Sequence, residues 1–313
     1  MTLRVAAVTM MRDDPFFLRI WHQYYSRQLG DDHLYVIDNG SVWADGMPSE
    51  IQDILARVSV VKIPFQDGVG RLQKRGFDYT RFSFINAFIA GLRSYYNIVL
   101  HNDIDELFVP DPARWSGLHD YLADEARRGG VVSGVGIELF QDVDADAAYD
   151  PAMPLFAQRP NYIYRVEYCK PHLFYSTDWV LPHKATKPFF LDPDLYLVHL
   201  KYLDADRIVA RQDDILDYYD KGMGGRRSRW SWSQQRLKNE FDKLAKRDTY
   251  DGAAFQHTEL FERDLPKRDA RYLINVPRDD GYYSVARAIT EDSFFALQDF
   301  RRRLPASFVD SGI

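Results

Sequence analysis

The sequence predicts an α/β fold in which a mostly parallel sheet is flanked by helices. Over the first half of the chain, apolar runs of strand length alternate with segments whose apolar residues recur at helical spacing. Such alternation implies right-handed crossovers between parallel strands. The 313 residues are enough for one large α/β domain or two modest ones, and 46% hydrophobic and 27% charged residues are ordinary values for a globular protein.

The predicted elements begin with a strand over residues 3–11, a continuous apolar run typical of a strand that is covered on both faces. Asp13, Asp14 and Pro15 then begin a helix that ends at Gly30. The remaining strands predicted for this half cover 33–38, 58–65, 97–100 and 131–140, and the remaining helices cover 79–96 and 118–128. Because ligands collect at the carboxyl ends of parallel strands, the residues directly after each strand are the first candidates for a site.

Past residue 142 the alternation gives way to short strand-like segments that are rich in Tyr and Phe and separated by prolines. Strands are expected at 162–168, 172–175 and 195–202, and helices at 204–220 and in a segment that ends at 246. We therefore expect a ligand-binding α/β half, residues 1–142, and an elaboration, residues 143–313, that packs on it to form one continuous domain.

Charge and cysteine content exclude several classes of protein. The chain has 40 Lys and Arg against 46 Asp and Glu, so we expect no nucleic-acid partner. A single cysteine, Cys169, excludes an internal disulfide framework and a cysteine-rich zinc site, and it fits a reducing compartment. The N-terminal apolar run is too short for a signal-peptide core, and no stretch approaches the ~18 apolar residues of a membrane span. We expect a cytoplasmic protein with at most peripheral contact at the inner face of the membrane.

Several familiar catalytic signatures are missing from the sequence. There is no P-loop, no His-Glu-x-x-His and no Gly-x-Ser-x-Gly, and Gly134-Val-Gly136 lacks the third glycine of a dinucleotide fingerprint. These absences argue against P-loop NTPases, ordinary dehydrogenases, zincins and α/β-hydrolases.

The pair Asp103-Ile-Asp105 directly follows the predicted strand 97–100. Other Asp-x-Asp matches occur in the chain, but only this one stands where an apolar strand ends in the middle of the sheet. If the chain stays extended there, both carboxylates project to the same side, where they repel unless a hard divalent cation neutralises them. The pattern predicts that Asp103 and Asp105 hold Mg²⁺ or Mn²⁺ with positions open for a diphosphate; a solvated acidic turn is the alternative.

The order of these features resembles the GT-A fold glycosyltransferases, particularly the family 2-like and DUF23-like group. The resemblance rests on Val8-Thr-Met-Met-Arg-Asp13, Trp21-His-Gln-Tyr-Tyr25, Tyr35-Val-Ile-Asp-Asn-Gly-Ser41 and Asn102-Asp-Ile-Asp-Glu-Leu-Phe108. It covers residues 3–142 and continues more loosely through 182–184 and 197–201. It implies a Rossmann-like sheet that binds a nucleotide-sugar and a metal held by the Asp-x-Asp pair.

The resemblance also implies roles for single residues. Asp103 would lie at the ribose and Asp105 on the metal, with His199 as a later metal or diphosphate ligand. The nucleoside would contact Thr9, Met10 and Asp38. The sequence departs from the family pattern where Asp-Asn-Gly-Ser replaces the paired acids after the second strand, and where no Glu-Asp pair is found to supply the catalytic base.

Glycosyl transfer from a nucleoside diphosphate builds negative charge on the leaving oxygen, which nearby cations stabilise. Arg71, Lys74, Arg75 and Arg81 are candidates, although a solvated connector explains any one of them equally well. Lys184 and Lys187 are further candidates. The run Arg226–Trp232 mixes arginines with tryptophans and is a candidate lid, sugar-stacking wall or lipid contact.

An inverting enzyme needs a carboxylate that takes the proton of the acceptor hydroxyl. Glu138 and Asp142, at the end of the strand after the metal pair, are the candidates. The resemblance thus implies transfer from a UDP- or GDP-linked sugar to a glycan or lipid-linked glycan. The alternatives are a nucleotidyltransferase and a carbohydrate- or nucleotide-binding module of the same fold without turnover.

Overall fold

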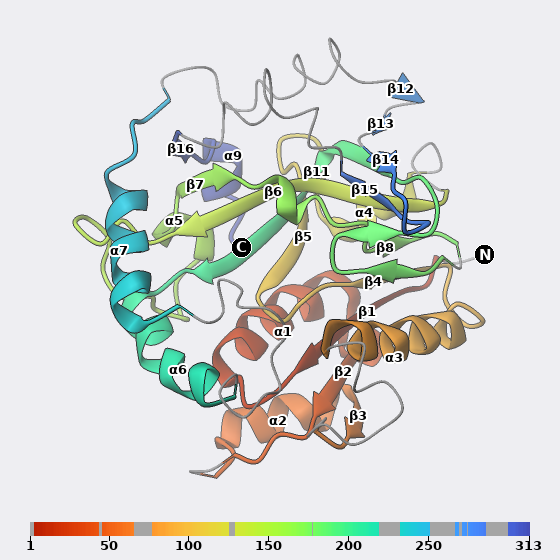
Figure 1. Cartoon of the computed structure of the whole chain (residues 1–313), viewed down its shortest axis with the longest axis horizontal. Helices are drawn as coiled ribbons and strands as arrows, with labels where there is room; N and C mark the ends of the chain where they lie inside the picture. The colour runs from red at the N-terminus through yellow and green to blue at the C-terminus, as the bar shows by residue number, and fades with distance from the viewer. Residues whose placement is uncertain are drawn as a thin grey trace.

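The computed structural model shows a large mixed sheet with helices against it, which confirms the predicted α/β class (Figure 1). The structure describes residues 3–43, 46–65, 77–124, 129–176, 178–218, 232–250, 267–268, 271–273, 275–285 and 300–313. No helix in these ranges is long and apolar enough to cross a membrane.

Most of the longer strands of the main sheet share one direction. In order across the sheet, the strands are β12 (Lys267–Arg268), β13 (Arg271–Leu273), β11 (Phe190–Tyr202), β6 (Val131–Phe140), β8 (Leu173–Phe174), β4 (Ile98–His101), β1 (Val5–Met11), β2 (Leu34–Asn39) and β3 (Ser59–Ile63). The pairs β3–β2, β2–β1 and β1–β4 are parallel, and so is β6–β11. The short strand β8 is antiparallel to both β4 and β6, so these two also point the same way. The predicted mostly parallel sheet is therefore confirmed.

Three helices connect the first four strands. Helix α1 (Pro15–Leu29) and helix α2 (Ser49–Arg57) contact each other, and helix α3 (Phe77–Leu92) precedes β4. Because β2 and β3 lie to one side of β1 and β4 lies to the other, the order of strands reverses between β1 and β4. Right-handed crossovers then place α3 on the face opposite to α1 and α2. The crevice at such a reversal is where an α/β sheet binds its ligand.

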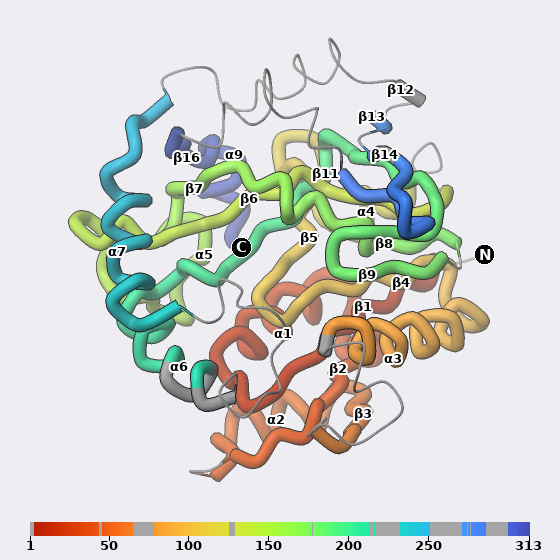
Figure 2. The backbone as a smooth tube through the Cα atoms, viewed as in Figure 1, coloured from red at the N-terminus to blue at the C-terminus, as the bar shows by residue number. Residues whose placement is uncertain are grey.

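The second half of the chain completes the same sheet. Strand β11 pairs with β6 along one edge and with β5 (Glu106–Pro110) and β13 along the other, as the path of the chain shows (Figure 2). Helices α6 (Ala205–Tyr218) and α7 (Gln234–Ala245) contact each other at one side of the molecule. The shorter described elements are α4 (Leu118–Ala123), α5 (Leu155–Gln158), β7 (Asn161–Tyr164), η4 (Val166–Tyr168), β16 (Arg302–Arg303) and α9 (Ala306–Val309). A separate small sheet contains β9 (Val180–Leu181), β10 (Lys184–Ala185), β14 (Asn275–Pro277) and β15 (Tyr283–Val285).

Helix α2 and strand β5 are the longest of the described elements that the sequence analysis does not predict. Helix α2 buries only Ile51 and Ile54, too short an apolar stripe to mark a helix by periodicity. Strand β5 begins only one residue after Asp105, because the chain turns there.

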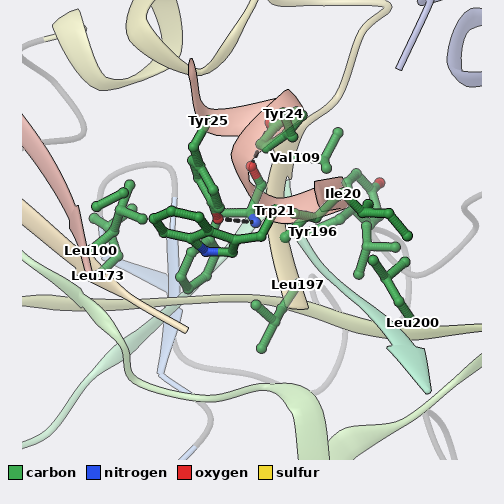
Figure 3. Close-up of a cluster of buried hydrophobic side chains, with 14 of the residues drawn as sticks. Ile20, Trp21, Tyr24, Tyr25, Leu100, Val109, Leu173, Tyr196, Leu197 and Leu200 are labelled. Atoms are coloured by element: carbon green, nitrogen blue, oxygen red, sulfur yellow. Dashed lines mark hydrogen bonds between the residues drawn. The ribbon is translucent and has the colours of Figure 1, made fainter. Parts of the chain in front are cut away.

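Aromatic side chains of α1 hold β5 in place (Figure 3). The backbone of Phe108 faces α1, where Tyr25 Oη accepts from its N–H at 2.8 Å and Tyr24 Oη donates to its carbonyl at 2.6 Å. A buried strand edge needs such partners, because unpaired backbone groups are costly away from water. Trp21, Tyr24 and Tyr25, part of the segment on which the family resemblance rests, thus support the strand that follows the acidic pair.

Candidate functional site

The acidic pair lies on a turn at the carboxyl edge of the sheet, between β4 and β5. The backbone N–H of Glu106 donates to the carbonyl of Asp103 at 3.0 Å and closes the turn. The expectation of an extended chain at this point was therefore wrong. A four-residue turn reverses the direction of the backbone, so the two carboxylates meet different partners.

Asn102 fixes this turn to its surroundings. Its Oδ1 accepts from Trp21 Nε1 at 3.4 Å, and its Nδ2 donates to the carbonyl of Glu106. Its backbone N–H donates to the carbonyl of Val8 on β1 at 3.3 Å. These bonds hold the turn where the order of strands reverses between β1 and β4, which is the place where an α/β sheet is expected to bind its ligand.

Asp103 is held by two cations. Arg81 of α3 donates from Nη1 to Oδ1 at 2.8 Å, and Lys170 donates from Nζ to Oδ2 at 2.7 Å. Lys170 also donates to Oε1 of fully buried Glu106 at 2.5 Å. Burial alone raises the pKa of Asp103, but Lys170 and Arg81 outweigh it and hold this pKa well below its usual range. Burial and the nearby carboxylates raise the pKa of Glu106, against the opposing effect of Lys170.

Asp105 lies instead against a histidine. His199 Nε2 is 3.3 Å from Asp105 Oδ2, and His199 Nδ1 is 3.0 Å from Oε1 of Glu138. The strand register explains this row, because His199 on β11 lies opposite Glu106 on β5 and Glu138 on β6. Burial lowers the pKa of His199, but the two carboxylates outweigh burial and raise it to about 9. His199 in turn lowers the pKa of Asp105 against the effect of burial.

Glu138 is completely buried, and both its oxygens accept hydrogen bonds. Arg165 Nε donates to Oε2 at 2.8 Å, while His199 Nδ1 and Tyr168 Oη (3.3 Å) contact Oε1. Burial opposes its ionisation, but His199 and Arg165 lower the pKa of Glu138 to about 2. A carboxylate on Nδ1 orients the imidazole so that Nε2 faces Asp105, as second-shell carboxylates do for metal-binding histidines. The role of Glu138 as base stays a prediction.

A short segment on β6, residues 165–170, brings in residues that the sequence prediction missed. It supplies Arg165 to Glu138, Lys170 to Asp103, and Tyr168, whose ring stacks on His199 at a centroid distance of 3.9 Å. The feature of the sequence that could have revealed this segment is Gly134-Val-Gly136, because glycines within a strand allow another stretch of backbone to approach closely. A Cβ at Gly136 would overlap the carbonyl oxygen of Arg165 and lie 2.8 Å from Cβ of Tyr168, so only glycine lets this segment approach β6.

The other predicted residues have different partners. Asp142 follows β6 and pairs with Arg301 at 2.7 Å, while its Oδ1 accepts from the backbone of Asp144. Lys184 pairs with Asp280 beside the small sheet.

The predicted nucleoside contacts lie at the ends of β1 and β2. Asp38 Oδ1 accepts from the backbone N–H of Ser41 at 2.9 Å, and Thr9 and Met10 are buried in β1. Arg71, Lys74 and Arg75 lie outside the described residues, as does the run Arg226–Trp232 apart from Trp232.

A divalent cation fits the Asp105–His199 pair. Asp105 Oδ1 has no hydrogen-bond partner in the described part of the chain, and Nε2 of His199 is turned toward the carboxylate. Carboxylate and imidazole together suit Mn²⁺, and the carboxylate suits Mg²⁺. Within the described ranges, no group of three or more His, Cys, Asp or Glu side chains is arranged to hold a metal ion. Of the described side chains, Asp105 and His199 are the two that would hold the cation.

Comparison with known protein families and with curated protein sequences finds no match. Among solved structures, the chain is similar to Staphylococcus aureus TarS, with a TM-score of 0.30 and 12% sequence identity. The match covers 84% of this chain and 46% of the TarS chain, so the chain spans about half the length of TarS. At this TM-score the likeness assigns no function; what the structure itself shows is a mostly parallel sheet flanked by helices.

Proposed function

We propose that this protein is a metal-dependent glycosyltransferase, which moves a sugar from a UDP- or GDP-linked donor to a hydroxyl of a glycan or lipid-linked glycan. The observation that carries the proposal is the Asp105–His199 pair at the carboxyl edge of the sheet, with His199 oriented by buried Glu138. A nucleotide-sugar donor and a lipid-linked acceptor would place the reaction in the cytoplasm, at the inner face of the membrane.

Asp105 and His199 would hold Mn²⁺ or Mg²⁺, which when bound stabilises the negative charge of the leaving diphosphate. Asp103, kept ionised by Arg81 and Lys170, would accept hydrogen bonds from ribose hydroxyls, the role that the resemblance implies. Stacked Tyr168 and the burial of His199 exclude water from one side of the pair. Preorganised charges in such surroundings act more strongly than they do in water.

The geometry favours structural roles for the two predicted bases. Both oxygens of Glu138 are engaged, so we assign this residue to the orientation of His199. Asp142 is engaged by Arg301 and by the turn after β6, and we assign it to the junction of β6 with the C-terminal region. The acceptor hydroxyl would lose its proton to a group outside this pair.

A thermal-shift panel tests the proposal directly. UDP, GDP, CDP and ADP, each with and without Mn²⁺, are added to the wild type and to Asp105→Asn. One nucleotide should raise the Tm only with Mn²⁺ and only in the wild type; ligand at 100 times its Kd adds about 2.7 kcal/mol to the free energy of unfolding. A shift that survives Asp105→Asn would contradict the role of Asp105.

Turnover assays separate the proposal from its alternatives. A glycosyltransferase releases nucleoside diphosphate from a nucleotide-sugar, whereas a nucleotidyltransferase releases pyrophosphate from a nucleoside triphosphate and a sugar phosphate. A binding module would give the thermal shift with neither product. Either of these last two outcomes would overturn the proposed transfer reaction.

A further inference from the structure

The ammonium group of Lys170 links the two ends of the turn that carries the acidic pair. It lies 2.7 Å from Asp103 Oδ2 and 2.5 Å from Glu106 Oε1, and its side chain is only 4% exposed. The other oxygen of Glu106 accepts from the backbone N–H of Asp103 at 3.2 Å. Lys170 therefore faces the turn, and both of the hydrogen bonds described for its ammonium group go to carboxylates of this chain.

Lys170 and Arg81 together engage both oxygens of Asp103. Asp105, two residues later, keeps one oxygen without a hydrogen-bond partner among the described residues and has only an imidazole beside the other. A divalent cation would meet repulsion from two fixed positive charges at Asp103, but no fixed cation contacts Asp105. Asp103 and Asp105 have the same carboxylate group, so their different attraction for a divalent cation comes from the side chains that contact them.

Lys170 is itself held at this position. The carbonyl of Lys170 accepts from the backbone N–H of His172 at 3.0 Å, and the neighbouring Cys169 Sγ accepts from Gly136 N at 3.4 Å. The residue thus reaches the turn from a segment packed directly on β6. The backbone at Lys170 is thus held by contacts that do not involve Asp103.

We propose that Lys170 is a positioning residue, which keeps Asp103 neutralised and away from a divalent cation, so that the cation takes Asp105 and His199 as its ligands from this chain. The inference rests on the proposed function for its catalytic meaning. Removing Lys170 should strengthen the binding of Mn²⁺, whereas most substitutions at a binding site weaken it. The variant leaves partly buried Asp103 and fully buried Glu106 with less positive charge beside them, and a divalent cation is then attracted to these carboxylates.

The experiment measures Mn²⁺ affinity directly, from the electron paramagnetic resonance signal of free Mn²⁺, without a donor. Lys170→Met should bind Mn²⁺ about tenfold more tightly than the wild type, since a tenfold change corresponds to a small gain in Coulomb energy at a partly solvated site. Lys170→Arg should restore the wild-type affinity. Asp103→Asn should weaken binding by about tenfold, because it leaves Lys170 and Arg81 with less compensating charge, and Asp105→Asn should lose binding by about 100-fold, because it removes a ligand.

Thermal denaturation with and without Mn²⁺ distinguishes the proposed role of Lys170 from a purely structural one. Mn²⁺ should raise the Tm of Lys170→Met by more than that of the wild type, because the cation takes over charge compensation. If Lys170→Met does not fold, the charge-balanced variant Lys170→Met with Glu106→Gln replaces it, with the same expected gain in affinity over Glu106→Gln alone.

Two results would overturn the inference. The first is a Lys170→Met variant that binds Mn²⁺ no more tightly than the wild type, or a double variant that binds no more tightly than Glu106→Gln; undetectable binding in both proteins of a pair counts as this result. The second is an Asp103→Asn variant that loses as much affinity as Asp105→Asn. Failure of the proposed function looks different. It would appear as wild-type protein that releases no diphosphate from any nucleotide-sugar, while the order of Mn²⁺ affinities among the variants would still decide the role of Lys170.

Discussion

Asp103 and Asp105 are two residues apart in the chain, yet they lie in different electrostatic surroundings. Asp103 is bound by Arg81 and Lys170, whereas Asp105 lies beside His199. The guanidinium and ammonium groups are permanently charged at neutral pH, but an imidazole can give up its proton. Under the proposed function, a divalent cation would replace a proton at His199, whereas at Asp103 it would compete with fixed charges. Spacing within a motif does not assign roles; the partners from distant elements do.

The partners of the two carboxylates also come from different parts of the fold. Arg81 is on α3 and Lys170 follows η4, so Asp103 joins two segments that are distant in the chain to one turn. His199 on β11 and Glu138 on β6 are neighbours in the strand register. Asp103 stabilises the turn, whereas Asp105 belongs to a preorganised row of side chains across the strands. Substitution of Asp103 should therefore mainly lower stability, and substitution of Asp105 should mainly lower turnover.

The largest effect is expected for Asp105→Asn. We expect turnover to fall by about 10³-fold, the scale of losing one preorganised charge at a reacting centre. Single-turnover release of nucleoside diphosphate, measured beside Asp103→Asn, is the appropriate assay. A variant that keeps its turnover would contradict the comparison drawn between the two residues.

The next effect is on stability, and it concerns Asp103→Asn. This change leaves Lys170 and Arg81 with less compensation, and breaking a buried ion pair costs about 3–5 kcal/mol. Asp103 is 23% exposed, so solvent screening reduces the expected loss in the free energy of unfolding to about 2 kcal/mol. Urea denaturation measures it, with Asp105→Asn as the matched variant. Equal losses of stability in both variants would show that the two carboxylates do not differ in this way.

A smaller change is expected from Glu138→Gln. Second-shell carboxylates contribute about 10- to 100-fold to metal affinity, so Mn²⁺ binding should weaken by that factor. Glu50→Gln is the control, because Glu50 lies on the surface and pairs only with Arg19 in the described contacts. Unchanged Mn²⁺ affinity in Glu138→Gln would remove the argument that this residue orients His199.

Gly136→Ala tests the segment that carries Lys170 and Tyr168 to the site. The new Cβ would overlap the carbonyl of Arg165, so the segment must move and turnover should fall by about tenfold. Gly91→Ala on α3 is the control, since its Cβ would meet no atom within 4 Å and an alanine favours the helix by about 1 kcal/mol. Turnover that drops equally in both variants would point to a general effect of the substitution.

The smallest effect is a chemical one at Cys169, the only cysteine of the chain. Burial raises the pKa of its thiol to about 12, against an ordinary value of 9.0, so the thiolate is about 10³-fold scarcer at pH 8 than in an exposed cysteine. Labelling by a disulfide reagent should be slow in the wild type and faster in Gly136→Ala, whose backbone N–H contacts the sulfur. Rapid labelling of the native wild type would show that the segment is not packed on β6.

The sequence indicated the site through local patterns. The strand 97–100, the acidic pair behind it and the aromatic residues of α1 were all recognisable, because strand periodicity and turn chemistry are short-range signals. The segment 165–170 was not predicted to supply Lys170 and Arg165. Charged residues between prolines carry no periodic signal, and only the close approach at Gly136 brings them to the acidic pair.

By itself, the sequence determined the α/β class, the alternation of strands and helices along the first half of the chain, and the edge of the sheet at which a ligand is expected. These follow from alternating apolar periodicity and from the handedness of crossovers, which depend on neighbouring residues. Only the tertiary structure decided that the chain turns after Asp103, that Lys170 and Arg81 neutralise this residue, and that His199 and Glu138 stand in one row with Asp105. Those contacts join residues 22 to 94 positions apart, as in Arg81–Asp103 and His199–Asp105. Electrostatic partners at such separations are chosen by packing, which no local pattern encodes.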